Sequence, residues 1–308
     1  MKQSISYYLT LLVIKVKGVK KNFSQDPIDY EKVRKEDVRN PKDRLFKGMQ
    51  IRKFKLQSTS VTELKIAETN QQLVVYIHGG AFISGPAQHH WDSLKTIVQQ
   101  TNCTAAWMCD YPKAPEHKIT EISRNIDEVY NSALAEYPAE KIILMGDSAG
   151  GTLIVALIQR LLVQQQQNNN IALLPKRIIL ISPVMDATMT NEKIAAVDKV
   201  DPMLSRKGVH SAKKMCVDTE NLLTDPMISP INGSFMGFPP TDLFLAENDV
   251  TFPDQLLTAQ KMKNAGVEAE TIKGVNMPHI WPLLPVMSEA KVALNTIVDI
   301  VRKCEKHN

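Results

Sequence analysis

Residues 146–150 read Gly-Asp-Ser-Ala-Gly, a G-x-S-x-G pattern centred on Ser148. The apolar run 141–147 before it predicts a strand, and the periodic apolar run 149–164 after it predicts a helix. A serine on such a sharp strand-to-helix turn stands above the end of a sheet, and glycine flanks it because a Cβ would collide there. The helix that follows directs N–H groups towards developing negative charge. We therefore predict that Ser148 is a nucleophile; a capping serine at a glycine-rich helix start is the weaker alternative.

A serine hydroxyl attacks efficiently only when a base takes its proton and a carboxylate holds that base in one tautomer. In folds with this turn, the chain order is serine, then aspartate or glutamate, then histidine. We predict His279 as the base, because it stands on a loop stiffened by Pro278 and Pro282 between the last predicted strand and the last predicted helix. His210 precedes any suitable acid, and His307 lies in the terminal tail.

The acid is expected where the strand predicted over 241–247 ends. Glu247, Asp249 and Asp254 are the candidates there. Glu247 lies close to the strand body, and Asp254 begins the next helix, where a carboxylate is commonly a cap. We predict that Asp249, on the loop between them, orients the histidine.

Attack on a carbonyl places negative charge on its oxygen, so preorganised N–H donors must be aimed at that atom. The stretch YIHGGAFISG, residues 76–85, places three of the 13 glycines of the chain within seven positions, directly after an apolar strand. We predict that Gly79, Gly80 and Ala81 supply main-chain donors from this loop and that Ala149 supplies another. Alanine is acceptable at position 81 because it keeps its N–H group.

The elements that must position these residues alternate between strand and helix from about residue 50 onwards. This alternation and the apolar strands predict an α/β fold with a mostly parallel sheet that is flanked by helices. Two antiparallel strands are expected first, at 51–56 and 61–67, followed by strands at 73–79, 105–111, 141–147, 177–183, 241–247 and 267–274. Helices are expected at 89–101, 119–136, 149–164 and 288–303, and the polar tract 164–170 is expected to be a surface loop.

Two segments fall outside this alternation. We predict an N-terminal helical cap segment over 1–48, a first core part over 49–183, a cap insertion over 184–230 and a second core part over 231–308. Residues 1–55 carry a net charge of +9, and the remainder carries −5. Apolar residues at spacings of three and four predict an amphipathic helix near the N-terminus, whose apolar face, formed by Ile5, Tyr8, Leu9, Leu12 and Val16, packs on the body. Contact of this helix with a membrane surface is the less favoured alternative.

The motifs resemble those of the hormone-sensitive-lipase-like esterases and lipases of the α/β-hydrolase fold. The resemblance runs from about residue 70 onwards and rests on HGGAFISG, DYPKAPEH, GDSAGG, END and PHIWP, which come in the family's order. It implies Ser148, Asp249 and His279 as a catalytic triad, residues 79–81 with Ala149 as the oxyanion hole, and a helical cap. Ala81 stands where the family usually has a third glycine.

These observations predict a serine carboxylesterase that acts on short- to medium-chain esters without a metal or cofactor. The alternatives are a deacetylase, an amidase or a lipase with the same triad, or a non-catalytic binding member of the fold. Phe82 and Trp281 are candidates for the substrate pocket, with core packing as the alternative for each. The expected partner is a small-molecule ester; no nucleic-acid-binding motif is visible, and homo-oligomerisation stays open. A cytoplasmic location is expected, because no targeting signal is visible.

Overall fold

The computed structural model describes residues 3–66, 71–101, 104–168 and 171–306. One eight-stranded sheet runs through the molecule in the order β1-β2-β4-β3-β5-β6-β7-β8. Strand β1 pairs antiparallel with β2, β2 pairs antiparallel with β4, and all other neighbours pair in parallel. This arrangement confirms the predicted fold class. The strands are β1 (Gln50–Leu56), β2 (Thr59–Lys65), β3 (Gln72–Ile77), β4 (Thr104–Asp110), β5 (Ile142–Asp147), β6 (Arg177–Ile181), β7 (Thr241–Ala246) and β8 (Ala269–Gly274).

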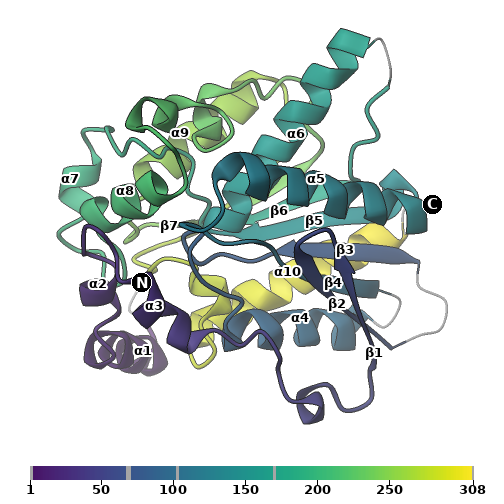
Figure 1. Ribbon diagram of the computed structural model, residues 1–308. Coiled ribbons are helices and arrows are strands. Elements are labelled where there is room, and N and C mark those ends of the chain that lie inside the picture. The colour runs from purple at the N-terminus through teal and green to yellow at the C-terminus, as the bar shows by residue number, and fades with distance from the viewer. Residues whose placement is uncertain (1–2, 67–70, 102–103, 169–170, 307–308) are drawn as a thin grey trace.

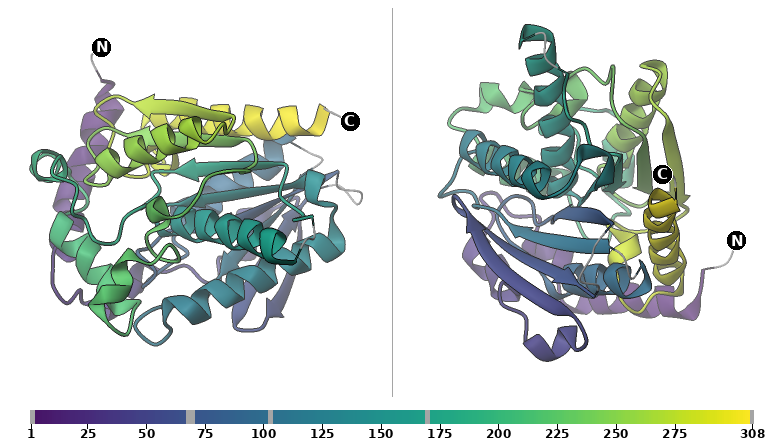
Figure 2. Two further views of the ribbon diagram at one scale, coloured as in Figure 1. Left: turned by 90° about the horizontal axis from the view of Figure 1, so that it is seen from above. Right: turned by 90° about the vertical axis from the view of Figure 1, so that its right-hand side faces the viewer.

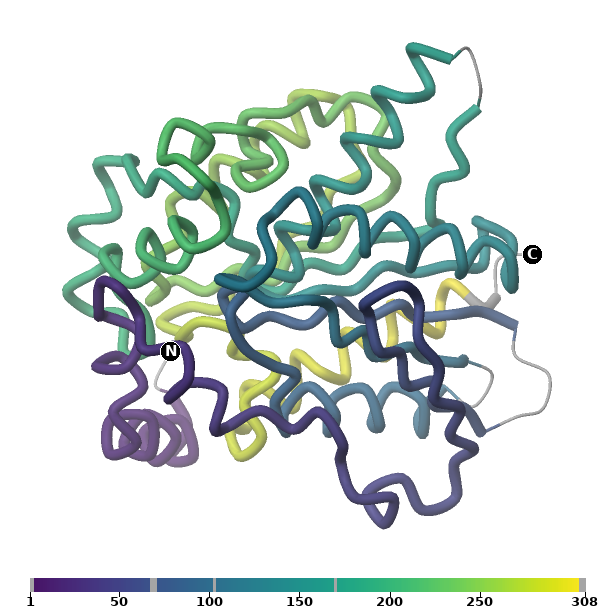
Figure 3. Tube along the Cα trace, in the orientation of Figure 1, coloured from purple at the N-terminus to yellow at the C-terminus, as the bar shows by residue number. Residues whose placement is uncertain are grey.

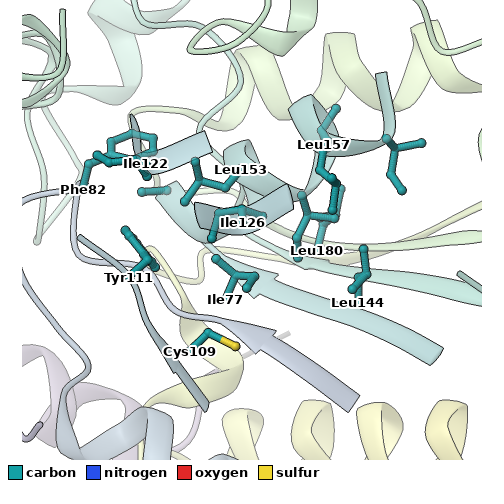
Figure 4. Close-up of a cluster of buried hydrophobic side chains, with 14 of the residues drawn as sticks. Ile77, Phe82, Cys109, Tyr111, Ile122, Ile126, Leu144, Leu153, Leu157 and Leu180 are labelled. Carbon is teal, nitrogen blue, oxygen red and sulfur yellow. The ribbon is translucent and has the colours of Figure 1, made fainter. Parts of the chain in front are cut away.

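Helices cover both faces of the sheet (Figure 1). On one face lie α5 (Ile119–Glu136), α6 (Ala149–Asn168) and α9 (Phe252–Asn264); on the other lie α4 (Gln88–Thr101) and α10 (Ser288–Lys306). Strand β3 contributes to the cores on both faces of the sheet, because its side chains point alternately to one face and the other. Leu73, Val75 and Ile77 join the core under α5 and α6, whereas Val74 and Tyr76 join the core over α4 and α10. Figure 4 shows Ile77 in the first of these cores.

The polar tract 164–170 corrects one prediction. It is not a loop from its start, because α6 continues to Asn168; residues 169–170 lie outside the described ranges. Glutamine is a good helix former, so a run of glutamines extends the helix into solvent without needing a partner. Figure 1 shows this end of α6 projecting from the body.

The N-terminal segment and residues 184–230 lie side by side at one end of the molecule (Figures 1 and 3). The side chain of Lys20 donates to the carbonyl oxygens of Asp198 and Asp201 at 2.5 and 2.8 Å, which joins the two segments. The N-terminal helices are α1 (Ile5–Val16), α2 (Val19–Asn22) and α3 (Tyr30–Val33), and the second segment contains α7 (Ile194–Val197) and α8 (Arg206–Met215). In the described ranges, no helix combines the length and the apolarity that crossing a membrane requires.

The orientation of α1 differs from the prediction. The apolar face that was expected to pack on the body is exposed, from 53% for Leu9 to 81% for Ile5. A second, shorter apolar face packs instead, through Tyr7 and Ile14. Polar contacts fix this orientation, because the Ser4 hydroxyl donates to the Glu289 carboxylate at 2.8 Å.

Candidate active site

Ser148 occupies the tight turn between β5 and α6. Its φ is 50°, a left-handed conformation that costs a non-glycine residue on the order of 1–3 kcal/mol. Crowding explains the neighbouring glycines: a Cβ on Gly146 would lie 2.8 Å from the carbonyl carbon of Gly150, and one on Gly150 would lie 1.8 Å from the carbonyl oxygen of Ile77. The Ser148 N–H donates to the carbonyl oxygen of Ile181 at 2.9 Å, so the end of β6 holds the turn.

The loop after β3 passes directly against this serine. A Cβ on Gly79 would lie 3.0 Å from the Ser148 Cβ and 2.2 Å from Oδ2 of Asp147, so a side chain is excluded there. Oδ1 of Asp147 accepts the Gly79 N–H at 2.9 Å and the Tyr76 hydroxyl at 3.0 Å. Burial works to raise the pKa of Asp147, but nearby His90, His89 and the Gly79 N–H outweigh burial, and the pKa is lowered. Asp147 is thus an ionised anchor for the loop.

This anchoring corrects one part of the predicted oxyanion hole. An amide has one hydrogen, and that of Gly79 is already directed at Asp147, so Gly79 brings the loop close without being a donor to substrate. Within the described part of the chain, no protein acceptor occupies the N–H groups of Gly80 and Ala81. The Ala149 N–H lies in the first turn of α6, where no acceptor exists within the helix. Three of the four predicted donors therefore stay available.

Asp249 and His279 form a buried pair. Asp249 follows β7 and is 0% exposed, and His279, on the loop after β8, is 4% exposed. Nδ1 of His279 lies 2.6 Å from Oδ2 of Asp249, which also accepts the Gln255 amide at 2.7 Å. The N–H and hydroxyl groups of Thr251 both donate to the other carboxylate oxygen at 2.8 Å. With the Nδ1 proton held by the carboxylate, Nε2 of the neutral ring is left as a proton acceptor.

Opposing effects set the charge of His279. Burial lowers its pKa, whereas the Asp249 carboxylate stabilises the imidazolium, assisted at longer range by Asp201 and Asp147. The carboxylates prevail, and the pKa of His279 is raised above its ordinary 6.5. The ring is therefore mostly neutral, and able to accept a proton, only when the pH is above this raised pKa.

Two hydrogen bonds bring the histidine and the serine to the same strand end. The N–H of Ile280, next to His279, donates to the Ser182 hydroxyl at 3.0 Å. Ser148 donates to Ile181, the residue before Ser182. The two candidate catalytic residues are thus anchored to consecutive residues at the end of β6.

The other acids considered as partners of His279 have partners elsewhere. The Glu247 carboxylate accepts from Lys273 at 2.6 Å and from the N–H of Asn276 at 2.9 Å. The Asp254 carboxylate accepts the Asn191 amide at 2.8 Å, and α9 has Thr251 at its N-cap position. Of the three candidates, Asp249 is the one that contacts His279.

Sequence reasoning missed Asp201, which places a second carboxylate beside Asp249. Its Oδ2 accepts the N–H of Val250 at 2.6 Å, and its Oδ1 accepts the N–H groups of Met203 and Leu204 at 2.7 and 2.8 Å. Burial, together with the Asp249 charge, raises the pKa of Asp201 to about 7. No spacing rule could have identified it, because it comes from the 184–230 segment, outside the strand–helix alternation.

Both candidate pocket residues belong to the core. Phe82 is 0% exposed, and its ring faces the Lys213 ammonium at 4.5 Å; Figure 4 shows it near Ile122. Trp281 is 6% exposed and donates its indole N–H to the carbonyl oxygen of Leu245 at 3.2 Å. Both side chains pack within the core clusters, as the alternative reading of each expected, and their part in a substrate pocket stays a prediction.

The model of the alpha/beta hydrolase fold family matches residues 74–283, a span that contains Ser148, Asp249 and His279. The chain belongs to the α/β-hydrolase family. An esterase of Acinetobacter venetianus is 31% identical to this hydrolase over 221 residues, which cover 71% of each chain. Hormone-sensitive lipase of Bos taurus is 34% identical over 92 residues, which cover 28% of this chain and 12% of that lipase.

The similarity extends to solved structures. A Staphylococcus aureus protein superimposes with a TM-score of 0.82 at 27% identity, covering 96% of this hydrolase and 99% of that chain. Together with the sequence relatives, this places the hydrolase among the esterases and lipases related to hormone-sensitive lipase, as a carboxylesterase of the serine-hydrolase class.

Proposed function

We propose that Ser148, His279 and Asp249 hydrolyse carboxylic esters through an acyl-enzyme. The Ser148 hydroxyl oxygen attacks the ester carbonyl carbon while Nε2 of His279 takes its proton. The tetrahedral intermediate then collapses, the carbon–oxygen bond to the alcohol breaks, and His279 protonates the leaving alcohol. A water molecule, deprotonated by the same nitrogen, attacks the acyl-enzyme and releases the acid and free Ser148. No step requires a metal or a cofactor.

The N–H groups of Gly80, Ala81 and Ala149 would stabilise the oxyanion in both halves of this reaction. They stand on two elements that are fixed relative to each other, because Asp147 at the end of β5 holds the Gly79 N–H. Such preorganised donors do not need to reorient as the charge develops, and losing one typically costs about 2.7–4 kcal/mol of transition-state stabilisation.

The single observation that carries the proposal is the 2.6 Å contact between Asp249 and His279. It joins two loops that are 30 residues apart in the sequence, and it holds the ring of His279 in the tautomer that a general base needs. A buried carboxylate–imidazole pair is costly unless its groups are satisfied, and here both carboxylate oxygens accept further donors. This arrangement is suited to catalysis by Ser148, which is anchored at the same end of β6.

The preference for short- to medium-chain esters rests on restricted access. Ser148 is only 8% exposed and His279 only 4% exposed. We infer that residues 1–48 and 184–230 form a cap over this end of the sheet, since hydrogen bonds from Lys20 to the 198–201 stretch join the two segments. A bulky acyl chain would have to displace part of that cap.

The test is hydrolysis of p-nitrophenyl esters from acetate to palmitate by the wild type and by Ser148→Ala. We expect activity that peaks at short chains and is lost in the variant. A preference for palmitate would contradict the narrow acyl site and favour a lipase, and silence of the wild type on every ester would favour amide substrates. A fluorophosphonate probe distinguishes an active serine hydrolase from a non-catalytic binding protein, because the binding protein would leave Ser148 unlabelled.

A further inference from the structure

The outer face of α1 is an apolar stripe without a partner in the described structure. Ile5, Tyr8, Leu9, Leu12, Val13 and Val16 lie three and four residues apart, so they share one helix face, and each is more than half exposed. Large contiguous apolar surfaces on soluble proteins commonly mark binding sites. Figures 1 and 2 show α1 at the periphery of the molecule.

Contacts on the inner side hold the stripe outward. The Ser4 N–H and hydroxyl donate to the Glu289 carboxylate at 2.7 and 2.8 Å, and the Tyr7 hydroxyl donates to the carbonyl oxygen of Asn276 at 2.9 Å. Tyr7 and Ile14 fill the gap beneath the helix and are 5% and 7% exposed. Turning the stripe inward would break these contacts, so its exposure is a stable feature of the fold.

The charged residues of the segment that carries the stripe have one sign. Residues 3–24 contain four lysines and no acidic residue. Lys15, Lys17 and Lys21 are exposed at the C-terminal end of α1 and just beyond it. An apolar stripe followed by lysines is the arrangement of helices that lie in the plane of a bilayer, with the apolar face among the acyl chains and the lysines at anionic headgroups.

We propose that α1 binds the surface of anionic lipid membranes through this stripe and these lysines. A second copy of the chain fits the observations less well. A two-fold dimer pairs the same patch with itself, and it would leave the lysines without complementary charge, because residues 3–24 contain no acidic residue. Anionic headgroups complement those lysines.

Membrane binding would place the proposed active site beside ester substrates that partition into the bilayer, a consequence that rests on the proposed function. The Tyr7 hydroxyl binds Asn276, three residues before His279 on the same loop. A bilayer against the outer side of α1 would therefore lie at the same end of the molecule as the catalytic loops. Ester substrates dissolved in that bilayer would have a short path to the cap.

The experiment is co-sedimentation of the full chain with phosphatidylcholine vesicles, with and without 30% phosphatidylserine. Leu9→Gln with Leu12→Gln removes the centre of the stripe, and we expect partitioning to fall at least about tenfold. Lys15→Gln with Lys17→Gln should weaken binding to the anionic vesicles by roughly tenfold or more, and added salt should have the same effect on the wild type.

Two matched controls keep the result specific. Leu256→Gln with Leu257→Gln alters two exposed leucines on α9, and Lys53→Gln with Lys55→Gln removes two exposed lysines from β1. Both pairs should bind vesicles as the wild type does. All variants should hydrolyse p-nitrophenyl acetate equally well, so failure of the lipid proposal is distinguishable from failure of the esterase proposal.

Wild-type protein that stays in the supernatant with anionic vesicles would overturn the proposal, as would unchanged binding by the leucine variant. Light scattering tests the competing occupant: a dimeric mass for the wild type that becomes monomeric in the leucine variant would assign the stripe to a second copy.

Discussion

Oδ2 of Asp201 accepts the N–H of Val250 at 2.6 Å, which ties a carboxylate from the 184–230 segment to the residue next to Asp249. Asp201 and Asp249 are both buried, and both carboxylates raise the pKa of His279, the proposed base. Asp249 orients the ring by direct contact, whereas Asp201 acts on it through its charge and through the main chain. Asp201 is thus a positioning residue whose effect should be visible in pH profiles.

The first prediction concerns the acid limb of the activity profile. Because the pKa of His279 is raised above 6.5, kcat/KM for p-nitrophenyl acetate should rise with pH through an apparent pKa above that value. Asp201→Asn removes one of the charges that stabilise the imidazolium, so the limb should move to lower pH. Steady-state rates between pH 5 and 9 provide the measurement. A limb that stays in place while only the amplitude falls would assign Asp201 a purely structural role.

Asp201 should also affect how stability depends on pH. Its pKa is 3.8 in the unfolded chain and about 7 in the folded protein, so between these values the folded state binds more protons. Because stability falls with pH wherever the folded state binds more protons, this group lowers the free energy of unfolding from about pH 4 to about pH 7.

The expected difference between the wild type and Asp201→Asn across this window is on the order of 2 kcal/mol. Urea unfolding at pH 4.5 and 7 measures it. The pKa of Asp254 is also raised, to about 6, so Asp254 contributes a slope of the same sign that remains in the variant. Parallel curves for the two proteins would show that Asp201 ionises normally in the fold.

A third prediction tests which carboxylate orients the base. Asp249→Asn keeps the volume of the side chain but removes the charge and the preference for an Nδ1 proton, so kcat should fall by on the order of 10⁴. Glu247→Gln and Asp254→Asn are matched controls, because these acids bind Lys273 and Asn191 instead. Each control should keep kcat within about threefold of the wild type. A large loss in a control with no loss in Asp249→Asn would reassign the triad.

Ala81 tests whether the loop donor is a main-chain group. Its φ is 56°, which glycine adopts freely, so Ala81→Gly should preserve kcat within about threefold. Ala81→Pro removes the N–H and cannot reach this φ, so kcat should fall by about 10²–10³ or more. Circular dichroism would verify that both variants fold. Full activity of a folded proline variant would exclude the Ala81 N–H from the oxyanion hole.

The parts of the site that depend on local patterns could be predicted from the sequence. Glycines flank Ser148 because the turn has no room for a Cβ, and the five-residue pattern at 146–150 already reveals this requirement in the sequence. Chain order and the loop between the last strand and the last helix predicted His279 as the base, and the structure places its ring against Asp249. The alternation of strands and helices along the sequence was sufficient to predict the mostly parallel sheet.

The features that could not be predicted from the sequence depend on contacts between residues far apart in the chain. Gly79 has the residue type of a loop donor, yet its N–H is directed at Asp147, a partner 68 residues away. The helix α1 has two apolar faces, and the contact of Ser4 with Glu289 across 285 residues decides which one packs. Phe82 looks like a pocket residue in sequence, but its ring is buried against the core.

The central claim is that Ser148 becomes covalently acylated with His279 as its base. Intact-mass spectrometry after treatment with a fluorophosphonate tests it most directly, using the wild type, Ser148→Ala and His279→Ala. We expect one adduct per wild-type chain, mapped to the peptide that contains Ser148, with none on Ser148→Ala and strongly slowed labelling of His279→Ala. An adduct on another residue, or equal labelling of wild type and Ser148→Ala, would contradict the claim.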